Sequence, residues 1–399
     1  MRIQRDRSNL TFRKRRRRRG CVPLTLLLGL LIGGVFVSWN WLGLRLVFFP
    51  PPATSADLRS AQRAFDAGEI DTAIAQAREL WQSNPNQVEA LRLLARALVY
   101  RSYYDWNRAV DRSTALAFTS EAYARMPGDP AVMAAHAFTL QANGRPADAA
   151  RIANQALRIN PREQLARVAR ALAYGRVGGY ENALRESEAA LALGESLDAR
   201  RALAISLSDM GRYQEAIATI EDAVAGHNRL LTLHFELALY AMQIGDADTA
   251  TAAYFSVLAF DPENIKARLR MCELSSTLRE TDTALAYCSE VVERAPTWAD
   301  GWYRLGREHF LNGSFAAAQN SLNRCSTLQT LHDVPMEDRI FDCWYLQGQA
   351  AEILGDCESL LKIYSEYQAM MQSANLPQTW TYPPEGPSIC IDPASVGSS

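Results

Sequence analysis

The stretch "ALAISLSDMGRYQEAIATIEDAV" (residues 202–224) holds two apolar, alanine-rich segments that are joined at Gly211. Ala216 follows this glycine by five residues, and the same spacing recurs in the pairs Gly68/Ala73, Gly144/Ala149, Gly178/Ala183, Gly245/Ala250 and Gly313/Ala318. Successive glycines from Gly144 onward lie 34, 33, 34 and then 68 residues apart, and 68 is twice 34. A 34-residue period predicts two helices per unit, with glycine at the turn between them.

Two further stretches share this pattern, "GWYRLGREHFLNGSFAAAQNSLNRC" (301–325) and "AYGRVGGYENALRESEAAL" (173–191). With these motifs the chain resembles the tetratricopeptide repeat family. The resemblance implies an all-α, right-handed superhelical solenoid, whose concave face is lined by the first helix of each unit. Numbering each unit so that the turn glycine is position 15 places small residues at positions 8 and 20, where the two helices approach most closely.

The repeat pattern divides residues 54–375 into nine units. Their predicted bounds are 54–87, 88–129, 130–163, 164–196, 197–230, 231–264, 265–298, 299–340 and 341–375. The second unit carries extra residues near 100–111, in the turn between its helices, and the eighth carries 326–338 after its second helix. Residues 376–399 are rich in Pro, Gly and Ser, which predicts a tail.

The start of the chain predicts a membrane anchor. Residues 1–20 form a basic segment with a net charge of +9, while the whole chain carries −2, so residues 21–399 carry −11. An apolar segment follows within 21–49, long enough to span a bilayer core about 30 Å thick as a helix. A proline-rich linker at 50–53 ends it. Because positive charge next to a span stays inside, we expect a single-pass protein of the cytoplasmic membrane with extracytoplasmic repeats.

Two other interpretations of the start remain open. A signal peptide could be cleaved after Ala53-Thr54-Ser55, although the apolar segment is long for one, or the segment could be a buried cytosolic helix. A nucleic-acid site at the arginine tract is disfavoured, because no aromatic platform accompanies it and the remaining chain is acidic.

Six of the seven cysteines lie in the last third of the chain, an even number beyond the proposed span. Within the repeat pattern, Cys272 and Cys288 stand at facing positions of one hairpin. Cys325 and Cys343 approach each other across a unit boundary. Cys357 is far from Cys343 within its unit, which leaves Cys390 in the tail as its partner. The pairs Cys272–Cys288, Cys325–Cys343 and Cys357–Cys390 are therefore predicted, on the condition that the repeats are extracytoplasmic.

No enzymatic motif stands out in the sequence. The five histidines form neither an HExxH motif nor a cluster with metal-ligand spacing, and no phosphate loop, dinucleotide motif or nucleophile elbow is present. We expect a non-enzymatic chain without cofactor, metal or small-molecule substrate. His136 and His309 fall at core positions and are expected to be structural.

The resemblance directs the search for a binding site to first-helix positions 2, 5, 9 and 12. Arg92 and Arg96 resemble the basic pair of the carboxylate-clamp subfamily, but Ala134 and Ala135 stand where that clamp needs polar partners. Later units contribute an apolar set that includes Phe138, Leu172, Phe235 and Leu239. Either this set forms a groove for an apolar helix or extended peptide, or tight superhelical curvature buries it.

The resulting hypothesis is a membrane-anchored scaffold that binds a protein or peptide partner outside the cytoplasm, for example during envelope assembly. A second hypothesis is an accessory or regulatory subunit of a membrane enzyme. A third, disfavoured by the charge distribution, is a nucleic-acid binder that uses the arginine tract.

Overall fold

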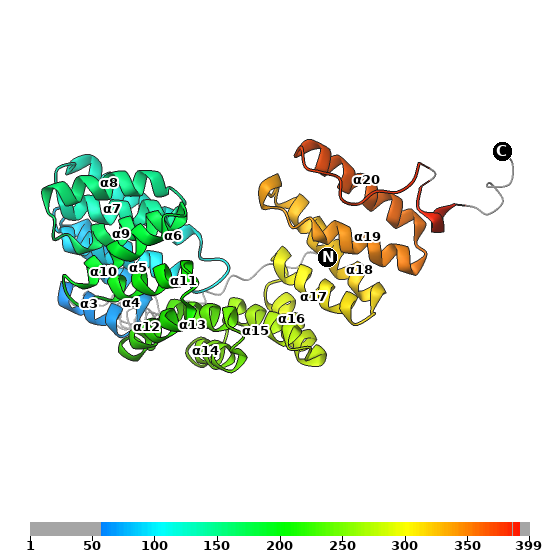
Figure 1. The fold of residues 1–399 in the computed structure, drawn as a ribbon, viewed down its shortest axis with the longest axis horizontal. Helices are drawn as coiled ribbons and strands as arrows, with labels where there is room; N and C mark the ends of the chain where they lie inside the picture. The colour runs from blue at the N-terminus through cyan, green and yellow to red at the C-terminus, as the bar shows by residue number, and fades with distance from the viewer. Residues whose placement is uncertain (1–56, 385, 392–399) are drawn as a thin grey trace, which may run out of the picture. The chain divides into compact units, whose positions relative to one another are not determined.

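The computed structural model describes residues 57–384 and 386–391, in which eighteen α-helices form nine antiparallel hairpins (Figure 1). The hairpins are α3 (Leu58–Asp66) with α4 (Ile70–Ser83), α5 (Val88–Arg101) with α6 (Val110–Arg125), α7 (Pro130–Ala142) with α8 (Pro146–Ile159), α9 (Gln164–Arg176) with α10 (Tyr180–Leu191), α11 (Leu197–Asp209) with α12 (Tyr213–Gly226), α13 (Leu231–Gln243) with α14 (Ala247–Phe260), α15 (Ile265–Thr277) with α16 (Thr281–Arg294), α17 (Ala299–Leu311) with α18 (Phe315–Leu331), and α19 (Asp342–Leu354) with α20 (Cys357–Ser373). Each of the nine predicted units therefore contains one hairpin.

The basic segment 1–20, the predicted transmembrane helix 21–49 and the linker 50–53 lie outside the described residues. Within the described part of the chain, no helix combines the length and the apolar character needed to cross a membrane.

Small residues let the two helices of a hairpin approach each other. Ala204 in α11 and Ala216 in α12 are fully buried. In the eighth hairpin the same role falls to Gly306, where an added Cβ would lie 2.6 Å from Leu322 Cγ. A larger side chain at this position would force the helices apart, which explains the small residues that recur at position 8.

The backbone conformation at the turns explains why glycine recurs there. Gly211 adopts φ 75°, in the left-handed region, and the next amide, Arg212 N–H, donates back to Leu207 O over 2.9 Å. This arrangement closes the end of α11 and starts α12 one residue later. In the seventh hairpin Arg279 occupies the same conformation at φ 63°, which a side chain makes less favourable.

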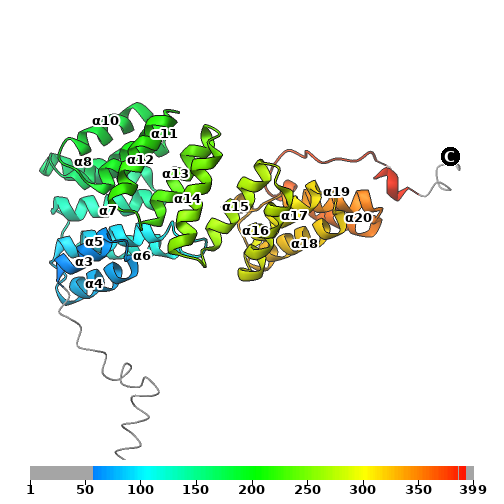
Figure 2. The same cartoon turned by 90° about the horizontal axis from the view of Figure 1, so that it is seen from below.

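Successive hairpins stack in chain order, and α3 to α14 close into a tight turn (Figures 1 and 2). Tyr100 on α5 donates from its hydroxyl to Asp198 Oδ1 on α11 over 3.0 Å, and its carbonyl accepts from Thr232 Oγ1 on α13 over 2.8 Å. The first hairpin also contacts a later part of the chain, because Gly68 lies against Arg229, just before α13. Contacts between residues about 100 to 160 positions apart thus fill the interior of the superhelix.

The predicted insertion in the second unit lies between α5 and α6, as residues 102–109. The prediction for 326–338 was wrong at its start, since α18 continues to Leu331 and only the following residues form the loop. The helix is longer because Leu328 and Gln329 are buried against the next hairpin. Gln329 also accepts from Ile340 N–H over 2.6 Å, which ties the loop to the extended helix.

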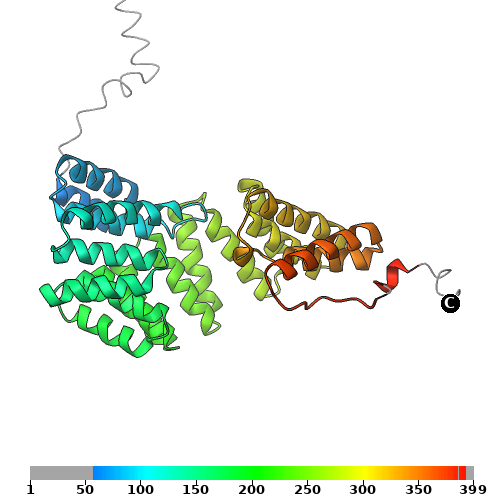
Figure 3. The same cartoon turned by 90° about the horizontal axis from the view of Figure 1, so that it is seen from above.

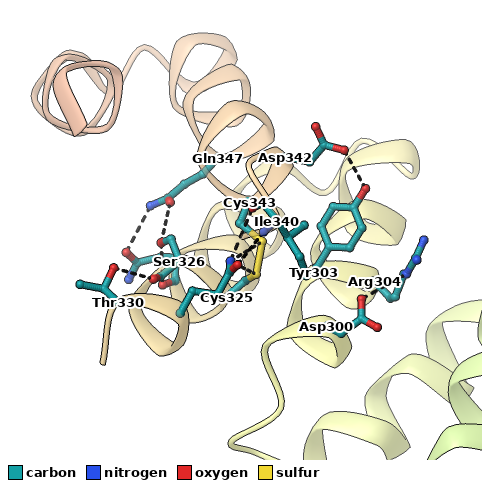
Figure 4. The surroundings of a disulfide bond; sticks show 12 residues. Asp300, Tyr303, Arg304, Cys325, Ser326, Thr330, Ile340, Asp342, Cys343 and Gln347 are labelled. Atoms are coloured by element: carbon teal, nitrogen blue, oxygen red, sulfur yellow. Dashed lines mark hydrogen bonds and ion pairs between the residues drawn. A yellow bond between two sulfur atoms is a disulfide. The ribbon is translucent and has the colours of Figure 1, made fainter. Parts of the chain in front are cut away.

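The structure contains the three disulfides expected from the repeat geometry. Cys272–Cys288 joins α15 to α16 with a Cα–Cα distance of 5.3 Å, and Cys325–Cys343 joins α18 to α19 with 6.0 Å. Around the second bond, Ser326 donates from Oγ to Gln347 Oε1 over 3.3 Å (Figure 4). Cross-links of this kind restrict the unfolded chain and so favour the folded one.

The tail is not a free end along its described length. After α20 it runs as an extended segment and ends in a short 3₁₀ turn, Ser388–Cys390 (Figure 3). Its third disulfide, Cys357–Cys390, has a Cα–Cα distance of 5.4 Å. Because Cys357 is the first residue of α20, the tail returns to the beginning of the helix that it follows.

Candidate binding site

Three of the four apolar residues expected on the concave face are buried. Phe138, Leu172 and Phe235 are exposed by only 1%, 8% and 9%, whereas Leu239 is 53% exposed. The tight turn of the superhelix packs the first helices α5, α7, α9 and α11 against one another, so Phe138 and Leu172 fill its interior. The groove alternative is therefore wrong for these two residues, and the curvature alternative describes them.

Arg92 and Arg96 are paired within the protein. Arg92 Nη2 lies 3.1 Å from Glu163 Oε1, and Arg96 Nε lies 2.5 Å from Asp198 Oδ2. The Arg96 guanidinium also lies 4.7 Å from the centre of the Phe65 ring. Burial raises the pKa of Glu163, although Arg92 opposes this effect. Arg92 thus joins the second unit to the third, and Arg96 joins the second unit to the fifth. Both charges are compensated by these carboxylates.

The extra residues 102–109, which we call the strap, reach from the second unit to the seventh. The Asp105 side chain accepts from the backbone N–H groups of Ile265 and Lys266 over 3.4 and 2.9 Å, at the start of α15. Trp106 stacks on Trp298 with the ring centres 5.2 Å apart. Free N–H groups at a helix start favour a carboxylate, so Asp105 holds the strap against α15.

An apolar cavity of about 510 Å³ opens between α13 and α15, beside the strap. Its lining residues are Tyr103, Thr232, Phe235, Glu236, Leu239, Met242, Tyr254, Lys266, Arg270, Glu273, Leu274 and Thr277. The first helices α5, α7, α9 and α11 pack against one another, whereas α13 and α15 make little direct contact. The gap leaves Leu239 accessible on the first-helix face that the family uses for binding.

Most charges around this cavity are compensated within the protein. Arg201 Nε donates to both carboxylate oxygens of Glu236 over 2.8 and 3.0 Å. Glu273 pairs with Arg270, and its Oε1 lies 2.9 Å from Arg304 Nη2. These ion pairs, of which Arg201–Glu236 is largely buried, orient the side chains and leave no free charge for a ligand.

Among the described residues that line the cavity, Lys266 is the charged side chain without a carboxylate partner. Its Nζ donates to Tyr103 O over 2.5 Å and lies 4.1 Å from the centre of the Phe235 ring. No carboxylate of the described residues lies within ion-pair distance of it. Burial, helped by Arg270, lowers the pKa of Lys266 to about 8. An ammonium group has three donors, so it retains capacity for an acceptor on a ligand.

A larger groove of about 830 Å³ lies between α18, α19 and α20. Amide and hydroxyl side chains such as Asn320, Asn323, Thr327 and Thr330 make up much of its wall. It therefore lacks the concentrated apolar surface of the cavity beside the strap. Across the described residues, no group of three or more His, Cys, Asp and Glu side chains is arranged to hold a metal ion.

The family assignment rests on sequence and fold together. A sequence model described as Tetratricopeptide repeat matches residues 201–265, which include α12, α13 and α14, and the nine stacked hairpins extend the same unit on both sides. Residues 201–265 are therefore tetratricopeptide repeats, and the other described hairpins share their fold. No curated protein matches its sequence.

Solved structures resemble this chain at low identity. The APC/C hetero-tetramer Cut9-Hcn1 aligns with a TM-score of 0.57 and 13% identity, over 73% of this chain and 54% of that chain. The C-terminal part of a tetratricopeptide-repeat protein from Cytophaga hutchinsonii aligns with a TM-score of 0.47 and 14% identity, over 60% of this chain and 96% of that chain. The TM-score of 0.57 shows a shared fold, but at 13% identity it shows nothing about function, which must be argued from the site.

Proposed function

We propose that this tetratricopeptide-repeat protein is a scaffold that captures a segment of a partner protein in the cavity between α13 and α15. The exposed Leu239, set among Phe235 and Met242, carries this proposal. An apolar side chain of the partner would cover Leu239 and remove its surface from water. In units three and four, Phe138 and Leu172 close the inner face, since they are exposed by only 1% and 8%.

The chemistry of the cavity also suggests the kind of segment. An apolar side chain would enter beside Leu239, and an acidic group would lie near Lys266. Because the carboxylates near Lys266 are already engaged, a ligand carboxylate would supply its missing partner. The pKa of Lys266 is about 8, so binding of an acidic segment should weaken as the pH rises through that value.

We further propose that the chain is anchored in the cytoplasmic membrane through 21–49, with the repeats outside. The charge of +9 at residues 1–20 supports this orientation, and so do the three disulfides, which persist in oxidising compartments. An extracytoplasmic scaffold would suit envelope assembly. If the partner proves to be a membrane enzyme, the chain would act as its accessory subunit.

The binding proposal is tested with full-length protein in detergent and an array of synthetic peptides that vary in apolar and acidic residues. Leu239→Glu should abolish peptide binding without lowering the melting temperature, because the side chain is largely exposed. Val177→Glu is the matched control, since Val177 is 63% exposed and lies outside the cavity. Equal binding by both variants and the wild type would contradict the proposal.

The location is tested separately. A reporter that works only in the cytoplasm, fused after Ser399, should be silent in intact cells. An active reporter would show that the orientation is wrong and would remove the argument from oxidation as well.

A further inference from the structure

The tail packs on the last hairpin through an aromatic cluster. Trp380 is only 4% exposed, and a Cβ added to Gly348 on α19 would lie 2.1 Å from its ring. The rings of Tyr364 and Tyr367 on α20 lie 5.0 and 5.4 Å from that of Trp380. Tyr382 donates from its hydroxyl to Glu352 Oε2 over 2.7 Å. The tail therefore covers the face on which a tenth hairpin would stack.

Beyond Tyr382 the described tail contains the buried Pro387, and Cys357–Cys390 holds its end. Both of these cysteines are partly exposed. The other two disulfides differ, because Cys272, Cys288, Cys325 and Cys343 all have an exposure of 0%. Thiol–disulfide exchange requires a thiolate to reach a sulfur atom directly, so access alone separates the third bond from the other two.

The position of Cys357 at the start of α20 determines which of the two sulfur atoms is attacked. A thiolate released there lies near the free N–H groups of the first helical turn, which favour an anion. The adjacent Asp356 opposes this effect, but its carboxylate already accepts from Ser359 N–H and from the Gln319 amide. A thiolate should therefore attack Cys390 Sγ rather than Cys357 Sγ, because Cys357 is then the leaving group.

From these observations we propose that Cys357–Cys390 is a thiol-exchange site and a releasable latch for the tail. A dithiol attacks Cys390 Sγ as a thiolate, and the bond to Cys357 breaks with its electron pair on Cys357 Sγ. The second thiol of the reagent, as a thiolate, then attacks the first sulfur of the reagent, which is bonded to Cys390, and Cys390 leaves as a thiolate. The protein gains two electrons and two thiols after protonation, and the dithiol becomes a cyclic disulfide.

Release of the latch frees the end of the tail while the array remains folded. Trp380, Tyr382 and Pro387 then hold the tail by noncovalent contacts alone. The site thus couples the thiol–disulfide state of the compartment to the cover on the last hairpin. This inference does not depend on where the partner peptide binds.

The first test treats the folded full-length protein in detergent with increasing dithiothreitol, followed by alkylation and peptide mass mapping. Cys357 and Cys390 should become alkylated at a dithiol concentration at least tenfold lower than the other four cysteines in the repeats. Simultaneous reduction of all three pairs, or reduction of Cys357–Cys390 last, would overturn the proposal.

The second test measures release of the tail with chymotrypsin in the absence of reductant. Cleavage of the Trp380–Thr381 bond should be at least tenfold faster in a Cys357→Ser/Cys390→Ser variant than in the wild type, while α3 to α18 remain protected. A Cys272→Ser/Cys288→Ser variant is the control and should leave the rate at Trp380 unchanged. An equally protected Trp380 in all three proteins would show that the disulfide does not hold the tail.

Discussion

The contact between Arg96 and Asp198 provides a direct test of the closed interior. Asp198 is 7% exposed and accepts both from Tyr100 and from Arg96, two residues of α5 that lie about 100 positions earlier in the chain. Replacing it in Asp198→Ala leaves the Arg96 cation buried without its carboxylate. Removing one member of a buried pair costs about 3–5 kcal/mol of the free energy of unfolding. This range already includes the lost Tyr100 hydrogen bond, because neighbouring interactions are not additive.

The matched control is Asp222→Ala. Asp222 also pairs with an arginine of α11, Arg200, over 2.8 Å, but its side chain is 69% exposed. An exposed pair contributes about 0–1 kcal/mol. The same Asp→Ala change, at Asp198 in α11 and at Asp222 in α12, should thus differ in its cost to the free energy of unfolding by at least about 2 kcal/mol according to burial.

Urea unfolding of the two variants, followed by circular dichroism, measures this difference. An array of repeats need not unfold in one step, so hydrogen exchange of the α5 and α11 amides should accompany the titration. A double variant, Arg96→Met/Asp198→Leu, should recover most of the lost stability by replacing the pair with apolar packing. If the free energies of unfolding of Asp198→Ala and Asp222→Ala differ by less than about 1 kcal/mol, the interior contact between α5 and α11 is not the one that the structure describes.

Three further predictions follow from burial, backbone conformation and protonation. Leu172→Glu should destabilise the array by several kcal/mol in a thermal melt, because the charge would be buried without a partner, and an unchanged melting temperature would show that Leu172 is accessible. Arg279→Gly should stabilise the protein by roughly 0.5–1 kcal/mol in urea titrations, since a side chain at φ 63° is unfavourable, and a loss of stability would refute this account of the turn. Burial, assisted by Arg145 and Arg151, lowers the pKa of His136 to about 4, so its folded form stays neutral while the unfolded chain takes up a proton below its ordinary pKa. Stability should therefore fall by roughly 1–3 kcal/mol as the pH drops from about 6.5 to about 4, and His136→Gln should remove that part of the pH dependence in melts at both pH values.

The periodic pattern alone predicted the units of the fold. Gly211 and the glycines equivalent to it marked the turns, because a left-handed backbone at the end of a helix favours glycine. Small residues such as Ala204 marked the places where helices meet. The cysteine pairs could be placed for a similar reason. Cys272 and Cys288 lie 16 residues apart in one hairpin, so their distance depends only on local geometry.

The candidate site was predicted only in part. Phe235 and Leu239 were expected on one inner surface, and both line the cavity. The strap was recognised as an insertion, but its contacts with Lys266 and Trp298 were not. Aromatic residues within the insertion, Tyr103, Tyr104 and Trp106, were the available signal, since such residues rarely stay exposed in a loop.

The sequence by itself determined the helical hairpins, their order, their turns and the likeness to a repeat family, because these features depend on neighbours within about 34 residues. Only the tertiary structure decided that Phe138 and Leu172 are buried while Leu239 is open. The curvature of a solenoid is the sum of small rotations between successive units, and no single unit encodes that sum. Contacts such as Tyr100 with Asp198 arise only when the accumulated rotation brings α5 opposite α11. The accessible part of the inner face is therefore a property of the whole stack.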